Sequence, residues 1–118
     1  MIVILQEPAK QDDMRKAQEH YPGYAKITID IKKEKVAIGG EYHFDAEQKL
    51  LEIGCKQDDI WGGGIELESK TIETNAMINV RAKINPHQDI QDEKIKKKFL
   101  IIAYKYLRSY ANKPTVLP

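Results

Sequence analysis

The sequence has few of the features that would reveal a function directly. Its single cysteine, Cys55, excludes an internal disulfide framework and a zinc site built from several cysteines. Nineteen Lys and Arg residues against eighteen Asp and Glu residues leave a formal charge of +1, so no overall field attracts nucleic acid or anionic lipid. The apolar run at the start, Met1–Leu5, is far too short for a signal peptide or a membrane span. We therefore expect a cytoplasmic protein without a membrane or nucleic-acid partner.

The composition predicts one small globular domain. The chain has 118 residues, of which 42% are hydrophobic and 31% are charged, and a chain of this length buries about two-thirds of its unfolded surface. We expect a single domain over residues 1–112. Residues 113–118 include Pro114 and Pro118 and are predicted to form a C-terminal surface tail.

The hydrophobic pattern predicts the element order β-α-β-β-α-β-β-α. The expected strands cover residues 1–5, 24–31, 36–44, 65–68 and 71–82, and the expected helices cover residues 8–21, 45–54 and 92–110. Two hairpins imply a mainly antiparallel sheet of about five strands, with the uniformly apolar first strand at its centre. We expect an α+β domain of two layers, in which the helices cover one face of the sheet and the other face stays open.

Three residues near the junction of the predicted strand 36–44 and the predicted helix 45–54 are candidates for metal binding or proton transfer. Glu41, His43 and Asp45 are spaced i, i+2, i+4, so on a strand they share one face at about 6.6 Å intervals. Carboxylate and imidazole groups bind a divalent metal, and without a metal His43 can carry a proton with Glu41 orienting it. Alternatively, Asp45 caps a helix and the other two are solvated polar residues. No other cofactor is predicted.

A second group of residues suits an anion. Asn79 and Arg81 alternate on the predicted last strand, and an arginine there can bind the carboxylate or phosphate of a small ligand. Asp30 is predicted to share this polar face, and the alternative is an internal ion pair of Arg81 with an acidic strand residue. Trp61, followed by Gly62–Gly64 in a predicted loop, either gates this surface or plugs the end of the core.

Several motifs together resemble a small bacterial and archaeal domain family of unknown function. They are Gly-Gly-Glu-x-His-x-Asp-x-Glu at 39–47, Asp-Ile-Trp-Gly at 59–62 and Asn-x-Arg at 79–81. The chain has Ala46 where the resemblance implies a cysteine, so a thiol mechanism is not expected. The resemblance covers nearly the whole chain and implies no particular activity.

The sequence therefore favours a binding or regulatory domain that uses the open sheet face around His43 and Arg81. The alternative is a small metal-assisted or acid/base enzyme built from the same residues. An exposed sheet also pairs readily with a second copy, so a homo-oligomer is a further expectation.

Overall fold

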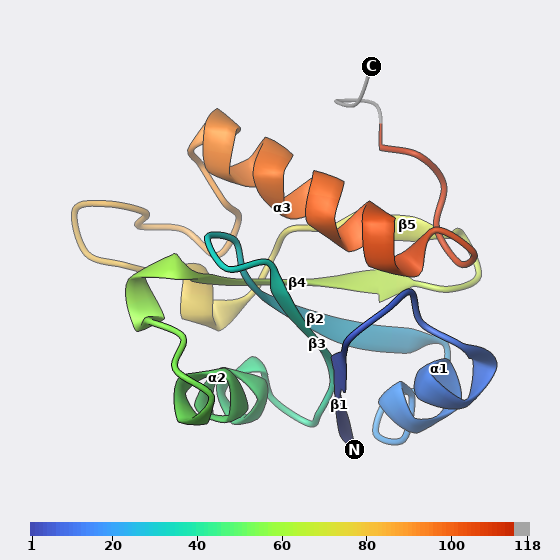
Figure 1. Cartoon of the computed structure of the whole chain (residues 1–118). Helices are drawn as coiled ribbons and strands as arrows, with labels where there is room; N and C mark the ends of the chain where they lie inside the picture. The colour runs from blue at the N-terminus through green and yellow to red at the C-terminus, as the bar shows by residue number, and fades with distance from the viewer. Residues whose placement is uncertain (115–118) are drawn as a thin grey trace.

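The computed structural model describes residues 1–114, and residues 115–118 of the predicted tail lie outside this range. Residues 1–114 form five strands and three α-helices (Figure 1). They are β1 (Ile2–Leu5), α1 (Gln11–Ala17), β2 (Tyr24–Asp30), β3 (Lys35–Gly39), α2 (His43–Glu52), β4 (Ile60–Glu66), β5 (Thr71–Glu73) and α3 (Glu93–Leu107). Two short 3₁₀ helices cover Gln57–Asp59 and Met77–Asn79. The predicted α+β class and element order are confirmed.

The strands form one antiparallel sheet in the order β1-β3-β2-β4-β5. The strand that was expected at the centre because it is apolar throughout, β1, instead lies at one edge. The centre is taken by β2, which pairs with β3 on one side and with β4 on the other. Hairpin connections place β2 and β3 side by side, and β1 then adds to the outer side of β3.

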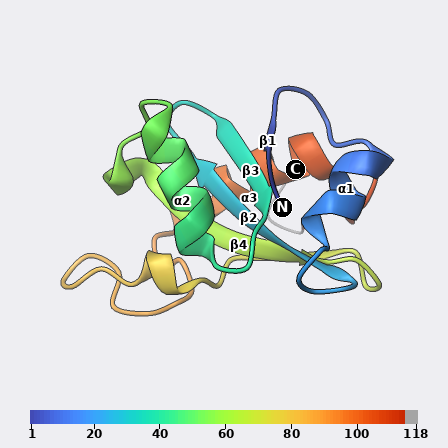
Figure 2. The same cartoon turned by 90° about the horizontal axis from the view of Figure 1, so that it is seen from below.

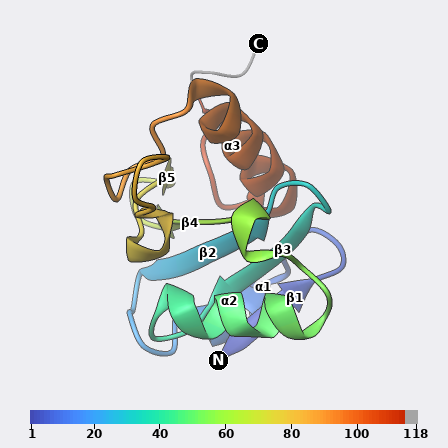
Figure 3. The ribbon, with the colours of Figure 1, turned by 90° about the vertical axis from the view of Figure 1, so that its left-hand side faces the viewer.

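Helices lie on both faces of the sheet, so the expectation of two layers with one open face is wrong. One buried cluster joins Ile27 and Ile29 of β2 to Met14 of α1 and Phe99 of α3. A second cluster, on the other face, joins β3 to α2 (Figure 3). The reason lies in β3, whose consecutive residues Val36–Ile38 are apolar and fully buried, since such a strand needs cover on both faces.

The third strand ends earlier than the sequence predicts. Gly39 and Gly40 have φ values of 90° and 96°, in the left-handed region that favours glycine, and they turn the chain out of the sheet. The Asp45 carboxylate then accepts a hydrogen bond from the backbone N–H of Tyr42 at 3.3 Å. This contact stabilises the first turn of α2, which therefore begins at His43 rather than at residue 45.

The predicted glycine loop is part of β4, which lies between β2 and β5. A Cβ atom at Gly62 would lie 2.9 Å from the His43 ring, and one at Gly64 would lie 1.9 Å from the Tyr24 hydroxyl oxygen. At Gly63 a Cβ would lie 2.2 Å from the backbone oxygen of Glu73. Neighbouring atoms thus approach β4 too closely for a side chain at any of these three positions, and only glycine fits.

Candidate functional site

On one face of the sheet, α2 packs against β2 and β3 (Figure 2). Thr28 and Asp30 of β2 are fully buried on this face, whereas Tyr24 and Lys26, further back along the same strand, are half-buried. Beyond the N-terminal end of α2 the surface forms a pocket of about 270 Å³. We call it the Lys26–His43 pocket; its lining residues are Lys26, Tyr42, His43, Phe44, Met77 and Ile78.

His43 is held in one orientation at this pocket. Only 9% of the residue is exposed, and its Nε2 lies 2.6 Å from the backbone oxygen of Gly63. Because a carbonyl only accepts, Nε2 carries the proton, and Nδ1 of the neutral ring is left as an acceptor. Burial, with a smaller effect from Lys26, lowers the pKa of His43 to about 4. The imidazole is therefore neutral near pH 7.

Within residues 1–114, Lys26 is the only charged residue that lines the pocket. Its ammonium lies 4.7 Å from the centroid of the Tyr21 ring and 5.7 Å from that of Tyr24, and within residues 1–114 it forms no ion pair. The Tyr24 hydroxyl donates to the Glu73 carboxylate at 2.7 Å. Burial and this hydrogen bond raise the pKa of Tyr24. The pocket thus combines a cation held by aromatic rings with a neutral imidazole.

The rim of the pocket is apolar and unusually exposed. Tyr42, Phe44 and Met77 are 61%, 58% and 68% exposed. They come from two separate segments, the start of α2 and the 3₁₀ helix after β5, and meet at this one pocket. Clustered exposed apolar side chains on a small domain indicate a contact surface.

The predicted arrangement of Glu41, His43 and Asp45 on one strand is wrong, because the chain leaves the sheet before Glu41. Glu41 is exposed, and its backbone oxygen accepts a hydrogen bond from the Tyr21 hydroxyl at 2.8 Å. Asp45 is occupied at the start of α2. Among the residues that the structure describes, no group of three His, Cys, Asp or Glu side chains is placed to hold a metal ion.

Asn79 lies not on a strand but in the 3₁₀ helix, where it is fully buried. Its Oδ1 accepts from the N–H of Gly62 at 2.8 Å, and its Nδ2 donates to the Gly62 oxygen at 2.9 Å. The same Nδ2 lies 3.2 Å from the Thr74 oxygen and 2.9 Å from the Gln88 oxygen. The Asn79 side chain thus makes the hydrogen bonds to Gly62 of β4 that a neighbouring strand would otherwise make. It also holds the segment that follows β5 against the sheet.

Arg81 and Trp61 lie together but apart from His43. The guanidinium stacks 3.8 Å from the centroid of the Trp61 ring, and Trp61, at 2% exposed, belongs to the cluster beneath α1 and α3. The adjacent Gly62 faces His43 on the opposite side of β4. Arg81 donates to the backbone oxygens of Asp58, at 2.9 Å, and of Ile60. Its donors are therefore engaged by main chain, and neither the predicted ion pair nor an exposed gate is formed.

Asp30, the remaining predicted site residue, organises the β2–β3 turn. Its Oδ1 accepts from the backbone N–H groups of Lys32 and Lys33, both at 2.9 Å. Its Oδ2 is fully buried without a hydrogen-bond partner among the described residues. The carboxylate lies beside Cys55, and burial together with Asp30 raises the pKa of that thiol to about 11. Asp30 is closed off from the pocket surface by its burial.

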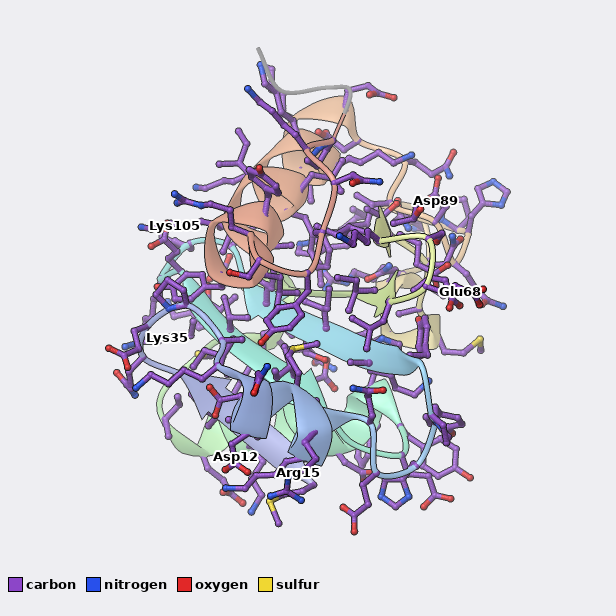
Figure 4. All side chains as sticks on the ribbon, turned by 90° about the vertical axis from the view of Figure 1, so that its right-hand side faces the viewer. Asp12, Arg15, Lys35, Glu68, Asp89 and Lys105 are labelled. Atoms are coloured by element: carbon purple, nitrogen blue, oxygen red, sulfur yellow. The ribbon has the colours of Figure 1, made fainter. Side chains whose placement is uncertain are left out.

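Two lysines of α3 form ion pairs with acidic residues. Lys96 forms an ion pair with Asp89, and Lys105 forms one with Glu34, each at 2.9 Å. Figure 4 shows Lys105 and Asp89 on opposite sides of the view, so the two ion pairs lie apart. No helix within residues 1–114 is long and apolar enough to cross a membrane.

Sequence reasoning missed Lys26, Tyr42, Phe44 and Met77 as site residues. The predicted strand 24–31 did not single out Lys26, and the predicted strand 36–44 ran through Tyr42 and Phe44. The available signal was the Gly39-Gly40 pair, because two consecutive left-handed residues end a strand. With α2 starting at residue 43, its first residues are brought against β4 rather than along an open sheet.

The buried imidazole predicts a specific loss of stability in mild acid. The pKa of His43 is about 4 in the folded chain against an ordinary value of 6.5. Between these values the unfolded chain binds a proton that the folded chain does not, so stability falls as pH drops. From about pH 7 to about pH 5 this amounts to about 2 kcal/mol. Urea unfolding of the wild type and of His43→Gln should show this loss in the wild type alone.

The exposed His87 provides the control for this measurement. His87→Gln should keep the wild-type dependence on pH, because its side chain lies outside the core. An equal loss of stability in His43→Gln and wild type would show that other groups are responsible.

The comparisons with known proteins agree with the resemblance noted in the sequence. No curated protein and no solved structure matches the chain. The family model described as "Protein of unknown function (DUF5674)" matches residues 3–106, nearly the whole chain. The chain therefore belongs to this family of proteins of unknown function.

Proposed function

We propose that the protein is a binding domain for a small ligand that joins an apolar body to an anionic group, and that the Lys26–His43 pocket receives it. One observation carries the proposal. Among the described residues, Lys26 is the only charged one that lines this pocket, and the other walls are a neutral imidazole and largely apolar side chains. A mostly apolar pocket with a few polar groups is the usual form of a small-molecule site.

Each part of the pocket has a chemical role in this proposal. The ammonium of Lys26 pairs with a carboxylate or a similar anion, and the exposed faces of Tyr42, Phe44 and Met77 cover the apolar body. Nδ1 of His43 accepts a hydrogen bond from a donor on the ligand. The volume of about 270 Å³ lies below the range of roughly 300–1,000 Å³ for drug-sized ligands. We therefore expect a ligand smaller than a typical drug molecule.

Phenylacetate and its uncharged amide, phenylacetamide, test the role of charge. We expect phenylacetate to shift the backbone amide NMR signals of Lys26, His43 and Met77, and to bind more tightly than the amide. Lys26→Gln should weaken phenylacetate binding about tenfold, which corresponds to about 1.4 kcal/mol. The same variant should bind phenylacetamide as the wild type does, because the lost interaction is with the carboxylate.

Lys98 offers a matched control, since it is exposed on α3. Lys98→Gln removes the same charge from the chain and should leave phenylacetate binding unchanged. Equal weakening by both variants, or signal shifts centred on other residues, would overturn the proposal that Lys26 binds the anion.

The alternative is an acid/base enzyme at the same pocket, and one observation favours it. Two groups with shifted pKa values, His43 and Tyr24, lie beside Lys26, and such groups gather at catalytic sites. Neutral His43 would take a proton at Nδ1 from a water that attacks an ester carbonyl, and the alcohol leaves as the carboxylate forms. Hydrolysis of 4-nitrophenyl acetate, lost in His43→Gln and kept in His87→Gln, would support this alternative. Binding of phenylacetate without any ester hydrolysis favours a binding domain.

We also propose that the protein works in the cytoplasm as the single domain 1–112. The support for this location is Cys55, the only cysteine, which is buried and has a raised pKa of about 11. A thiol of this kind suits a reducing compartment, where it has no disulfide to form.

A further inference from the structure

The edge strand β1 has the composition of a strand from the inside of a sheet. Its sequence is Ile-Val-Ile-Leu, and Ile2, Val3 and Ile4 remain half-exposed on both of its faces. Val3 packs against the cluster beneath α1 and α3, and Ile2 and Ile4 pack against the cluster beneath α2. Both hydrophobic clusters therefore reach the edge of the molecule at this strand.

The outer edge of β1 is available for pairing. Apart from its pairing with β3, no backbone group of Ile2–Leu5 has a hydrogen-bond partner within residues 1–114. The strand carries no charge or proline, the features that usually protect an edge. It lies between α1 and α2 on the side of the molecule that faces the viewer in Figure 2. Beside it is a groove of about 230 Å³ lined by Val3–Leu5 and by polar residues of the next segment, Gln6, Glu7, Lys10 and Asp13.

The opposite edge, β5, is protected. It has only three residues, and Asn112 donates to the backbone oxygen of Lys70 at 2.8 Å, just before the strand. The next segment continues through a bridge between Asn75 and Asp89. The fold therefore protects one edge with its own chain and leaves the more apolar edge open.

We infer that β1 pairs with β1 of a second copy, in antiparallel orientation, to form a ten-stranded sheet across a two-fold axis. Because β1 is apolar on both faces, a strand paired with it must also be apolar on both faces. The β1 strand of a second copy meets this requirement. A second copy supplies both hydrophobic faces at once, and both clusters continue across the axis. Pairing of identical patches is the usual geometry of a two-fold dimer.

The alternation of side chains restricts the register of this pairing. Directly opposed residues of antiparallel strands point to the same face, so the axis passes through Ile2, Val3 or Ile4, each opposite its own copy. Centring on Ile2 would leave Ile4 and Leu5 without an opposed strand residue. Centring on Val3 places Ile2 opposite Ile4 and matches the half-exposed residues with one another. Centring on Ile4 would instead oppose Val3 to Leu5, which is already 6% exposed. We therefore place the axis at Val3.

Sedimentation of the full chain over a range of concentrations tests the association. The wild type should be a dimer at the upper end of the range, and Val3→Lys should be a monomer throughout, because two lysines would face each other at the axis. Ile72→Lys, a matched change at the equally half-buried residue of β5, should leave the dimer intact. A monomeric wild type, or a folded Val3→Lys protein that remains a dimer, would overturn the inference.

Cross-linking gives a second test that does not depend on how Val3→Lys folds. Opposed residues of antiparallel strands have Cα atoms about 4.5–5.5 Å apart, close enough for a disulfide. Mild oxidation should therefore link Val3→Cys chains into covalent dimers, while Ile72→Cys chains and the wild type, whose Cys55 is buried, stay single. Failure of Val3→Cys to cross-link where Ile72→Cys does would contradict pairing at β1. Dimers linked through Ile4→Cys alone would contradict the register.

Discussion

Replacement of Asn79 by alanine is expected to lower the free energy of unfolding by roughly 4 kcal/mol. The side chain is fully buried, and its removal leaves the N–H and the oxygen of Gly62 without their partner, whereas the oxygens of Thr74 and Gln88 keep the backbone N–H groups of Ile90 and Ala76. Each buried polar group left unpaired costs about 1–3 kcal/mol. Because small domains are stable by only about 5–15 kcal/mol, this one change brings the chain close to unfolding. Urea denaturation measures the loss.

Asn75 is the matched control, because it lies in the same segment and is exposed. Asn75→Ala should change the stability by less than about 0.5 kcal/mol. A similarly small effect of Asn79→Ala would show that water takes over its hydrogen bonds, and the segment would then not depend on this side chain. Phenylacetate binding should weaken with Asn79→Ala even where the chain stays folded, since the same segment carries Met77 to the pocket.

The secondary structure was predictable where hydrophobic periodicity decided it. Ala25, Ile27 and Ile29 alternate on β2, and Phe99 and Ile102 lie on the buried side of α3, as their spacing indicates. The arrangement of layers was not predictable in this way. Thr28 and Asp30 look like solvated strand residues in the sequence, yet both are fully buried beneath α2. Hydrophobic periodicity shows which residues share a face of the strand. Whether a helix covers that face depends on packing between distant parts of the chain.

The candidate site followed the sequence only in part. His43 was predicted and lies at the pocket, whereas Arg81 and Asn79 were assigned to a ligand and are hydrogen bonded to main-chain groups. Long polar side chains satisfy buried backbone where the chain leaves regular structure, and the sequence does not mark those positions. Lys26 was missed for the opposite reason, since nothing local distinguishes a strand lysine that lines a pocket from one in water.

The glycine run of β4 shows the same dependence on distant residues. No local pattern indicates that Gly62, Gly63 and Gly64 belong to a strand, because glycine is depleted from strands and enriched in loops. Side chains of neighbouring elements fill the space beside these glycines and pack against β4. Phe99 of α3 lies against Gly63, and Tyr24 of β2 lies against Gly64. Close approach to other groups, rather than flexibility, is thus the reason for these glycines.

Gly63→Ala is therefore expected to lower the free energy of unfolding by about 3 kcal/mol or more, at or above the usual range for overpacking. The new Cβ would lie 2.2 Å from the backbone oxygen of Glu73 and 2.8 Å from the Phe99 ring, so β4 and β5 would have to separate. Differential scanning calorimetry or urea unfolding measures the loss.

Second-site variants distinguish a contact with a side chain from a contact with the main chain. At Gly64 the obstacle is the far end of the Tyr24 side chain, so Tyr24→Ala should recover much of the stability lost in Gly64→Ala. Phe99→Ala should recover little of the loss in Gly63→Ala, because the Glu73 oxygen is main chain and stays in place. Recovery of Gly63→Ala by Phe99→Ala would mean that the aromatic ring sets the limit, and that the β4–β5 pairing accepts a side chain at residue 63.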